Sequence, residues 1–302
     1  MARDVDVLGA ARLIPSTRLV VAFVLLSAFL HAAWNAMLRM ERDKDRALVA
    51  AVLMATVIAV IVAVVRCAIT GDAPLPSTSA AWALAAGVFE WLYFASLARA
   101  LELGTLGTVY TISRGGSVVL VWPLSVALFA EHVTTAAAVG SLVVLAGLAL
   151  CGTGDRQHGP PGAARRAIGW AVACAGSIAL YHLAYKGAED AGGNPSAVFA
   201  VALGLATAIN IARLGTDGRA ASLEILRTRT ARVVLMGATC GGSFLILLEA
   251  LSHGGAGFVL TLRNTSVLFA AALAWAIGER PRHQQLVGAL FVAAGAVVMA
   301  SQ

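Results

Sequence analysis

Six ionisable side chains lie inside long apolar stretches of the chain, where a charge is costly and usually faces a bundle interior or a wet cavity. They are His31, Glu90, Arg114, His182, Glu249 and Arg263. Arginines hold anionic groups through charge-assisted hydrogen bonds, and a histidine can exchange a proton near neutral pH. The set therefore predicts either a site for a charged small molecule or structural ion pairs that join the two arginines to Glu90 and Glu249.

Two polar clusters occupy matching places in the two halves of the sequence. Each combines a histidine, an aromatic residue three positions later and a polar residue beside it. The members are His31, Trp34 and Asn35 in the first half and His182, Tyr185 and Lys186, displaced by 151 positions, in the second half. Residues three and four apart share one face of an α-helix. A single histidine of this kind is usually a packing residue, but two in register are equally consistent with the lining of a shared cavity.

A longer pattern indicates that the chain is a duplicated unit. The motif Glu131, Gly140, Gly147 recurs 148 positions later, at residues 279, 288 and 295. Two apolar halves of this kind favour a membrane carrier built from paired repeats around a central site. A carboxylate at the start of an apolar helix complements the positive end of the helix dipole. Glu131 and Glu279 are therefore interpreted as structural residues at the starts of their own helices.

Composition places these residues in lipid. The 302-residue chain is 59% hydrophobic and 13% charged, with a mean hydropathy of +0.83, more apolar than one soluble core requires. A spanning helix needs about 20 apolar residues, and ten segments approach or exceed this length. They are 19–38, 47–69, 79–98, 105–129, 135–151, 168–184, 196–214, 233–251, 257–277 and 284–300. The predicted fold is an all-α membrane protein with a tail (1–18), a first repeat of five spans (19–152), a linker (153–167) and a second repeat of five spans (168–302).

The charged residues outside the spans indicate how the chain contacts the membrane surface. The net charge is +6, and 15 lysine and arginine residues fall in or beside the odd-numbered connections, against five in the termini and even-numbered connections. This pattern favours contact with anionic lipid rather than with nucleic acid, and the positive-inside rule places the termini outside the cell. The four cysteines lack metal-type spacing, so neither a metal nor another cofactor is expected.

The order and spacing of several short motifs resemble the EamA family of the drug/metabolite transporter superfamily. The motifs are His31-Ala-Ala-Trp34-Asn35, Ser113-Arg114, Leu262-Arg263-Asn264-Thr265-Ser266 and the repeated glutamate and glycine pattern. The resemblance covers about residues 19 to 300. It implies ten helices in two inverted five-helix repeats, a central cavity, alternating access and both termini in the cytoplasm. The last point opposes the charge distribution; we prefer the resemblance, and expect a bacterial plasma membrane.

The expected function is secondary transport of a small polar metabolite, amino-acid-like or otherwise anionic or zwitterionic, with export favoured. His31 stands eight positions before Arg39. In the small multidrug carriers of the same superfamily a proton-binding carboxylate precedes a basic residue by the same spacing, so His31 is the expected proton site. The alternatives are a membrane-embedded enzyme, which would need a nucleophile with a base, a metal motif or paired carboxylates, and a non-transporting sensor, which would need a sizeable soluble domain. Expected partners are the substrate and membrane lipids, and the oligomeric state stays open.

Overall fold

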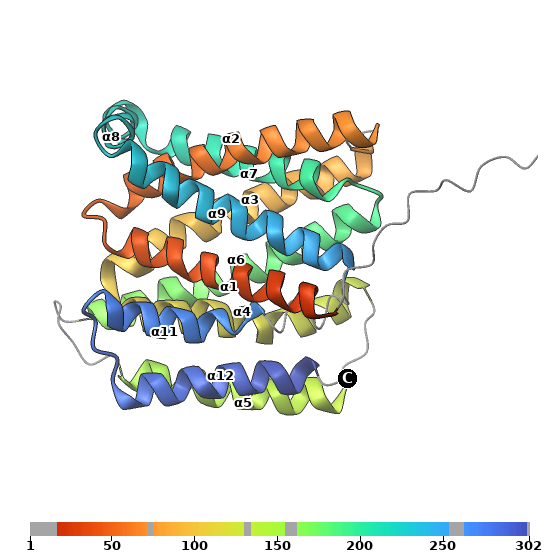
Figure 1. Cartoon of the computed structure of the whole chain (residues 1–302). Coiled ribbons are helices and arrows are strands. Elements are labelled where there is room, and N and C mark those ends of the chain that lie inside the picture. Colours follow the sequence, from red (N-terminus) through yellow and green to blue (C-terminus); the bar gives the residue numbers. More distant parts are fainter. Residues whose placement is uncertain (1–16, 72–74, 130–133, 155–161, 254–262, 301–302) are drawn as a thin grey trace, which may run out of the picture.

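The structure, a computed structural model, describes residues 17–71, 75–129, 134–154, 162–253 and 263–300. Within these ranges it contains eleven α-helices and no strand. Their bounds are α1 Thr17–Arg39, α2 Lys44–Thr70, α3 Ser77–Leu103, α4 Leu106–Phe129, α5 Thr135–Gly154, α6 Ala163–Asp190, α7 Pro195–Arg213, α8 Gly215–Thr228, α9 Thr230–His253, α11 Ser266–Ala276 and α12 His283–Ala300. Figure 1 shows the helices side by side along one direction, except α8, which lies across the others at one end. The predicted all-α class is confirmed.

Six of the described helices are long and apolar enough to cross a membrane: α1, α2, α3, α6, α7 and α9. Two shorter apolar helical stretches, Ala138–Leu150 and Ser266–Ala276, accompany them. Each predicted segment overlaps a described helix, with boundaries that agree within a few residues. The segment 257–277 is an exception, since the structure describes only its part from residue 263 onward. The chain is therefore a multi-pass integral membrane protein.

Local sequence signals set several helix ends. Asp43 caps α2, because its side chain accepts a hydrogen bond from the Arg46 backbone N–H at 3.1 Å. Asn194 caps α7 in the same manner, and Pro195 occupies the first turn, where its missing N–H is not needed. Gly278, with φ of 88°, turns the chain out of α11 in a left-handed conformation that glycine adopts at little cost.

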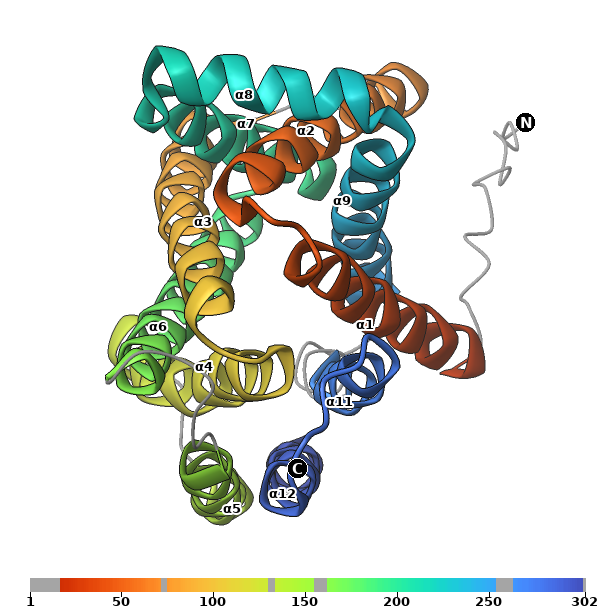
Figure 2. The ribbon, with the colours of Figure 1, turned by 90° about the vertical axis from the view of Figure 1, so that its left-hand side faces the viewer.

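Helix α8 is absent from the predicted elements, because its segment has no apolar run of spanning length. Its 14 residues rise about 21 Å, too little for a bilayer core of about 30 Å. Figure 2, which looks along the other helices, shows α8 lying across the ends of α7 and α2. Gly218 and Ser222 are buried against the bundle, whereas Arg219, Leu223 and Arg227 are exposed. We call this side of the molecule the α8 end.

Helix packing follows a pattern in which the two halves exchange partners. If α1 to α5 are matched in order with α6, α7, α9, α11 and α12, the contact of α3 with α6 corresponds to that of α9 with α1, and both are extensive. The contacts α4–α6 and α11–α1 form a second matched pair, and α3–α7 and α9–α2 form a third. Helices α1 and α4 touch each other only slightly, and α11 packs against both.

The repeated glycines lie where α5 and α12 pack together. A Cβ atom at Gly147 would lie 2.6 Å from the carbonyl oxygen of Gly288, and one at Gly295 would lie 2.7 Å from that of Gly140. A side chain at either position would collide with backbone, so glycine permits the close approach of these helices. The contact is reciprocal, and the motif that repeats along the sequence therefore corresponds to a matched pair of helices in space.

Candidate functional site

Three of the predicted ionisable residues meet in the interior of the bundle. They are His31 from α1, Arg114 from α4 and Arg263 from the turn before α11, with exposed fractions of 1%, 4% and 3%. The Arg114 guanidinium is hydrogen-bonded to His31 Nε2, and Arg263 Nη2 lies 3.4 Å from His31 Nδ1. We call these three residues the Arg–His–Arg cluster. Two arginines, one from α4 and one from the turn before its counterpart α11, thus converge on one imidazole.

The neighbours of His31 determine which ring nitrogen accepts a hydrogen bond. A guanidinium only donates, so Nε2, which faces Arg114, is an acceptor. Nδ1 lies 3.4 Å from two groups that also only donate, Trp34 Nε1 and Arg263 Nη2, and 3.4 Å from Ser243 Oγ, which can accept. Ser243 Oγ donates its own proton to the Cys240 carbonyl oxygen at 2.7 Å. A neutral ring whose Nε2 accepts from Arg114 carries its proton on Nδ1, where Ser243 Oγ is the acceptor among these three neighbours, and a second proton on Nε2 would point at the guanidinium.

The two arginines have no carboxylate within ion-pair distance among the described residues. Arg263 Nε and Nη1 are buried and lack a hydrogen-bond partner there. Arg114 Cζ lies 5.9 Å from the Tyr110 ring centroid, and Arg263 Cζ lies 4.7 Å from the Phe244 ring centroid. Such cation–π contacts contribute about 0.5–2 kcal/mol, less than the several kcal/mol that burial of each charge costs. An anionic group would complete this arrangement.

Aromatic rings surround the Arg–His–Arg cluster. The His31 ring centroid lies 5.7 Å from the ring centroids of both Trp34 and Phe244. Phe244 of α9 stacks on Phe199 of α7 at 5.2 Å, and Tyr181 of α6 lies 6.1 Å from Phe244. These rings present apolar faces toward the cluster, so polar contacts of a bound molecule would concentrate on the charged groups.

Glu90 of α3 and Tyr185 of α6 form a second buried polar group. The Tyr185 hydroxyl donates to Glu90 Oε1 at 2.9 Å, and the two side chains are 1% and 7% exposed respectively. Glu90 Oε2 is buried without a hydrogen-bond partner among the described residues. Glu90 does not pair with either arginine of the cluster. The structural ion pairs considered from the sequence are therefore not what this arrangement shows.

Two further members of the predicted set, Asn35 and His182, lie inside the bundle. Asn35 Nδ2 donates to the His31 carbonyl oxygen at 2.7 Å, one turn back along α1, while its Oδ1 is buried without a partner in the described part of the chain. The His182 ring lies 4.4 Å from that of Tyr181, and its Nε2 is likewise buried and unpartnered there. Both side chains thus offer polar atoms close to the Arg–His–Arg cluster.

Lys186 and Glu249 lie away from the cluster. Lys186 is exposed, and its Nζ lies 3.9 Å from Asp190 one turn later in α6. A residue next to Tyr185 in a helix is rotated by about 100°, which carries its side chain off the buried face. Glu249 forms a partly exposed ion pair with Arg66 at 3.0 Å, near the ends of α9 and α2.

The site also contains residues that the sequence predictions do not include. They are Tyr110, Tyr181, Ser243 and Phe244. Tyr110 precedes Arg114 by one helical turn, and Tyr181 precedes Tyr185 by one helical turn, so helical spacing alone could place them beside predicted residues. Ser243 and Phe244 follow a pair of glycines in α9, a signal for close helix packing that does not reveal which helix is approached. In the described ranges no group of three His, Cys, Asp or Glu residues could hold a metal ion.

One carboxylate ties several helices together at the α8 end. Glu279 accepts from Arg39 Nε at 2.7 Å and from the Leu106 backbone N–H at 2.8 Å, and Arg39 Nη1 donates to the Leu101 carbonyl oxygen at 3.1 Å. We call this group the Glu279 latch. The prediction that Glu279 begins its own helix is wrong, since α12 begins at residue 283 and the carboxylate caps α4 instead. Glu131, its counterpart, lies outside the described residues.

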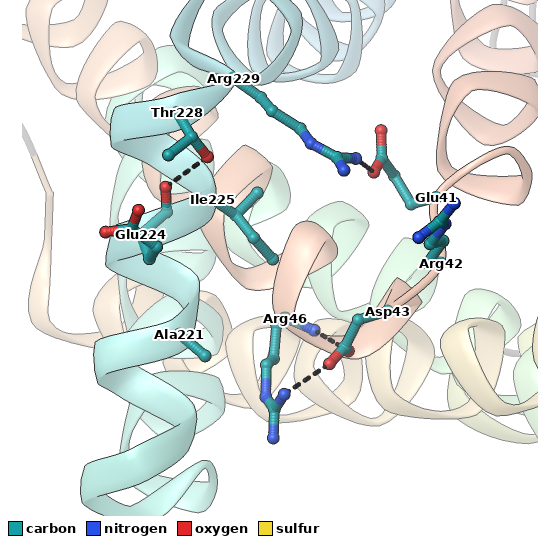
Figure 3. A pocket seen from close by; sticks show the side chains of 9 residues that line it. All are labelled: Glu41, Arg42, Asp43, Arg46, Ala221, Glu224, Ile225, Thr228 and Arg229. Carbon is teal, nitrogen blue, oxygen red and sulfur yellow. Dashed lines mark hydrogen bonds and ion pairs between the residues drawn. The ribbon is translucent and has the colours of Figure 1, made fainter.

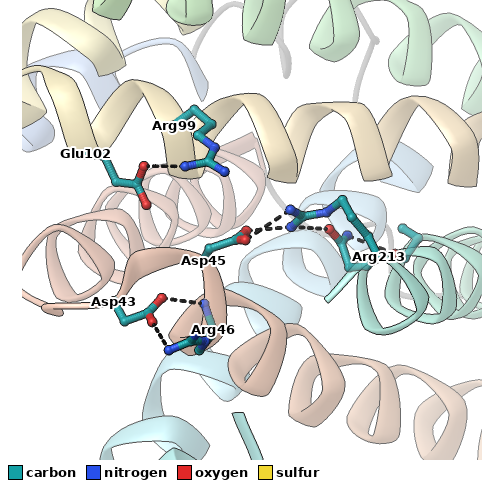
Figure 4. Close-up of polar contacts among 8 residues, drawn as sticks. Asp43, Asp45, Arg46, Arg99, Glu102 and Arg213 are labelled. Atoms are coloured by element: carbon teal, nitrogen blue, oxygen red, sulfur yellow. Dashed lines mark hydrogen bonds and ion pairs between the residues drawn. The ribbon is translucent and has the colours of Figure 1, made fainter. Parts of the chain in front are cut away.

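Further ion pairs join the α1–α2 loop to the helices around it. Arg229, just after α8, binds Glu41 at 2.8 Å, and Figure 3 shows this pair at a pocket of about 320 Å³ between the loop and α8. Arg213 at the end of α7 binds Asp45 at the start of α2 at 2.5 Å, as Figure 4 shows. Because these charges pair with one another, they fasten helix ends together.

Comparisons with known proteins agree with this architecture. Sixteen chains of solved structures match the fold, and one of them, a protein crystal structure, aligns with 93% of this chain and 96% of its own at a TM-score of 0.60 and 16% identity. Similarity at this identity establishes the fold alone. No curated protein matches the chain. Residues 165–301 match the EamA-like transporter family. The second half of the chain is thus similar to the EamA-like transporter family, which belongs to the drug/metabolite transporter superfamily.

Proposed function

We propose that the chain is a secondary transporter that carries a small anionic or zwitterionic metabolite, such as an amino acid, by alternating access. The observation that carries this proposal is the pair of buried arginines, Arg114 and Arg263, which face one imidazole and, in the described part of the chain, no carboxylate. A carboxylate on the substrate is planar and accepts two parallel hydrogen bonds, which matches the fork of a guanidinium. The substrate would thereby supply the counter-charge that the described residues do not.

We further propose ten spans arranged as two inverted five-helix repeats. The exchanged packing partners and the reciprocal glycine contact of α5 with α12 support this arrangement. In such carriers the substrate site lies where the repeats meet. The Arg–His–Arg cluster fits that position, because it draws residues from the first and fourth helices of one half and from the fourth helix of the other.

The seam between α1 and α4 is the part of this design that can open. The two helices pack only slightly, but polar contacts join them at two levels: His31 with Arg114 inside the bundle, and Arg39 with Glu279 and Leu106 at the α8 end. Eight residues separate the two levels on each helix, or about 12 Å at 1.5 Å per residue. We propose that the Glu279 latch closes the α8 end of the pathway and that its release opens this end.

We place both termini in the cytoplasm, in a bacterial plasma membrane, as the family resemblance implies, with export as the expected direction. A fluorescent protein or alkaline phosphatase fused after Gln302 tests the orientation. Fluorescence without phosphatase activity is expected. The reverse would mean that the basic residues of the α8 end set the orientation by the positive-inside rule.

The proposed function is tested with matched triples of small molecules. Each triple contains an amino acid, the carboxylate that lacks its amine and the amine that lacks its carboxylate. In proteoliposomes that contain the purified chain, saturable counterflow is expected for members with a carboxylate and not for the amine. Arg99→Gln is the control for general charge loss, because Arg99 is exposed and pairs with Glu102 on its own helix. Transport of the amines alone, or of no triple, would contradict the proposal.

A further inference from the structure

Glu90 is an isolated carboxyl group in the interior of a membrane protein. One oxygen accepts a hydrogen bond from Tyr185, and the other is buried without a partner among the described residues. A buried carboxylate without a cation loses hydration that one hydrogen bond replaces only in part. Such a group ordinarily avoids this cost by binding a proton. Ionisable residues of this kind within membrane spans mark proton relays as well as substrate sites.

We propose that Glu90 is a proton-binding site of the transport cycle, and that its proton and the substrate anion are loaded in the same state. The coupling to a substrate anion rests on the proposed function, whereas the proton site itself does not. The proton binds a carboxylate oxygen of Glu90 from water and returns to water when the site opens, so no other reactant is consumed. Tyr185 donates to Oε1 and leaves Oε2 as the oxygen available to carry the proton.

Among the ionisable groups that face Glu90, none titrates as readily near neutral pH as Glu90 itself. Tyr185 and Tyr181 approach from α6, and Cys240 approaches from α9. Their ordinary pKa values, about 10 for tyrosine and about 8.5 for cysteine, lie above neutrality. His31 lies on the arginine side, where Arg114 occupies its accepting nitrogen. His182 is the remaining neutral-range group, so its own variant belongs in the test.

The sign of the coupling follows from charge. When Glu90 is protonated, Arg114 and Arg263 keep two positive charges with which no carboxylate among the described residues pairs, and this favours an anion. Tyr181 lies within electrostatic range of Arg114, Arg263 and Glu90 alike, so the negative charge of an ionised Glu90 would partly offset the arginines and the anion would be held less tightly. Linkage is reciprocal, so a bound anion favours the proton on Glu90 by the same factor, typically about 5–150-fold. Proton and anion would travel together, so an inward proton gradient alone would drive uptake, and the export proposed above would follow an outward gradient of the substrate.

Infrared spectroscopy of the full chain in nanodiscs tests the proton site without any substrate. A carbonyl stretch from a protonated carboxyl is expected near neutral pH, to be lost at alkaline pH and to be absent in Glu90→Gln. Tyr185→Phe should shift the band, because it removes the hydrogen bond to Oε1. Glu249→Gln is the matched control, since that carboxyl is paired with Arg66 and partly exposed, and it should keep the band. An unchanged band in Glu90→Gln would overturn the proposal.

Binding of the matched triples then tests the coupling. In the parent protein, affinity for carboxylate members should fall by roughly fivefold or more from acid to alkaline pH. Glu90→Gln should bind tightly at every pH, whereas Glu249→Gln and His182→Gln should keep the parent's pH dependence. If binding by Glu90→Gln still depends on pH, the coupling is wrong. It is also wrong if Glu90→Gln loses binding only of the amine-bearing members, because Glu90 would then be a site for the ammonium group. If no triple binds, the proposed function fails while the infrared band still decides whether Glu90 holds a proton.

Discussion

Glu279→Gln is expected to loosen the seam between α1 and α4 at the α8 end. The carboxylate accepts two hydrogen bonds, from Arg39 Nε at 2.7 Å and from the Leu106 N–H at 2.8 Å, and the ion pair is 27% and 17% exposed. Charge-assisted hydrogen bonds contribute about 1.5–3 kcal/mol and neutral ones about 0.5–1.5 kcal/mol. Loss of the charge on two bonds should therefore cost about 2 kcal/mol, which is roughly 25-fold in the ratio of closed to open states.

Distance measurements between spin labels would detect this change. Labels at Met40, after α1, and His283, at the start of α12, occupy exposed positions on the two sides of the latch. In a cysteine-free background, Glu279→Gln should populate a longer distance that the parent protein rarely visits. Glu102→Gln is the control, because Glu102 forms its ion pair with Arg99, at 3.0 Å, within one helix. An unchanged distribution in Glu279→Gln, or an equal change in the control, would refute the latch.

Two further predictions concern packing and proton coupling. Gly147→Ala should destabilise the chain by about 1–3 kcal/mol, because the new Cβ would meet the Gly288 carbonyl oxygen at 2.6 Å. Gly176→Ala in α6, where the added Cβ meets no atom within 4 Å, should leave the thermal unfolding midpoint unchanged or raise it, and equal effects would argue against the α5–α12 contact. His31→Gln retains an acceptor for Arg114 but cannot titrate, so carboxylate binding should keep its dependence on pH. If carboxylate affinity in His31→Gln does not change with pH, His31 and not Glu90 is the proton site.

Periodicity and hydropathy were sufficient for the helical class and for most helix positions, because lipid requires long apolar segments whose lengths can be read directly. Helix α8 was not predicted, because a short amphipathic helix at the surface has no apolar segment of spanning length. The family resemblance is confirmed over residues 165–301. Glu279 was misplaced, since its capping of α4 depends on a turn at Gly278 and on the neighbouring helices. No local sequence rule specifies which distant helix a carboxylate will cap.

The site shows the same division between local and long-range information. Apolar context alone singled out His31, Arg114 and Arg263. The two arginines lie 83 and 232 positions after the histidine that they contact. Their meeting at one ring requires the packing of α1, α4 and α11. The sequence could not decide between an ion pair with Glu90 and a vacant pair of arginines, because both satisfy the same pattern of charges.

The central claim is that Arg114 and Arg263 hold an anion, and the affinity of the double variant Arg114→Gln/Arg263→Gln tests it most directly. Glutamine keeps hydrogen bonding but removes the charge, so each substitution should cost about 1.4 kcal/mol or more of binding, or at least tenfold. Calorimetric titration with the carboxylate members of the triples measures this loss, with Arg99→Gln as control and the unfolding midpoint as a check on folding. The account predicts at least a hundredfold weaker binding in a folded double variant. Unchanged affinity in that variant would contradict it.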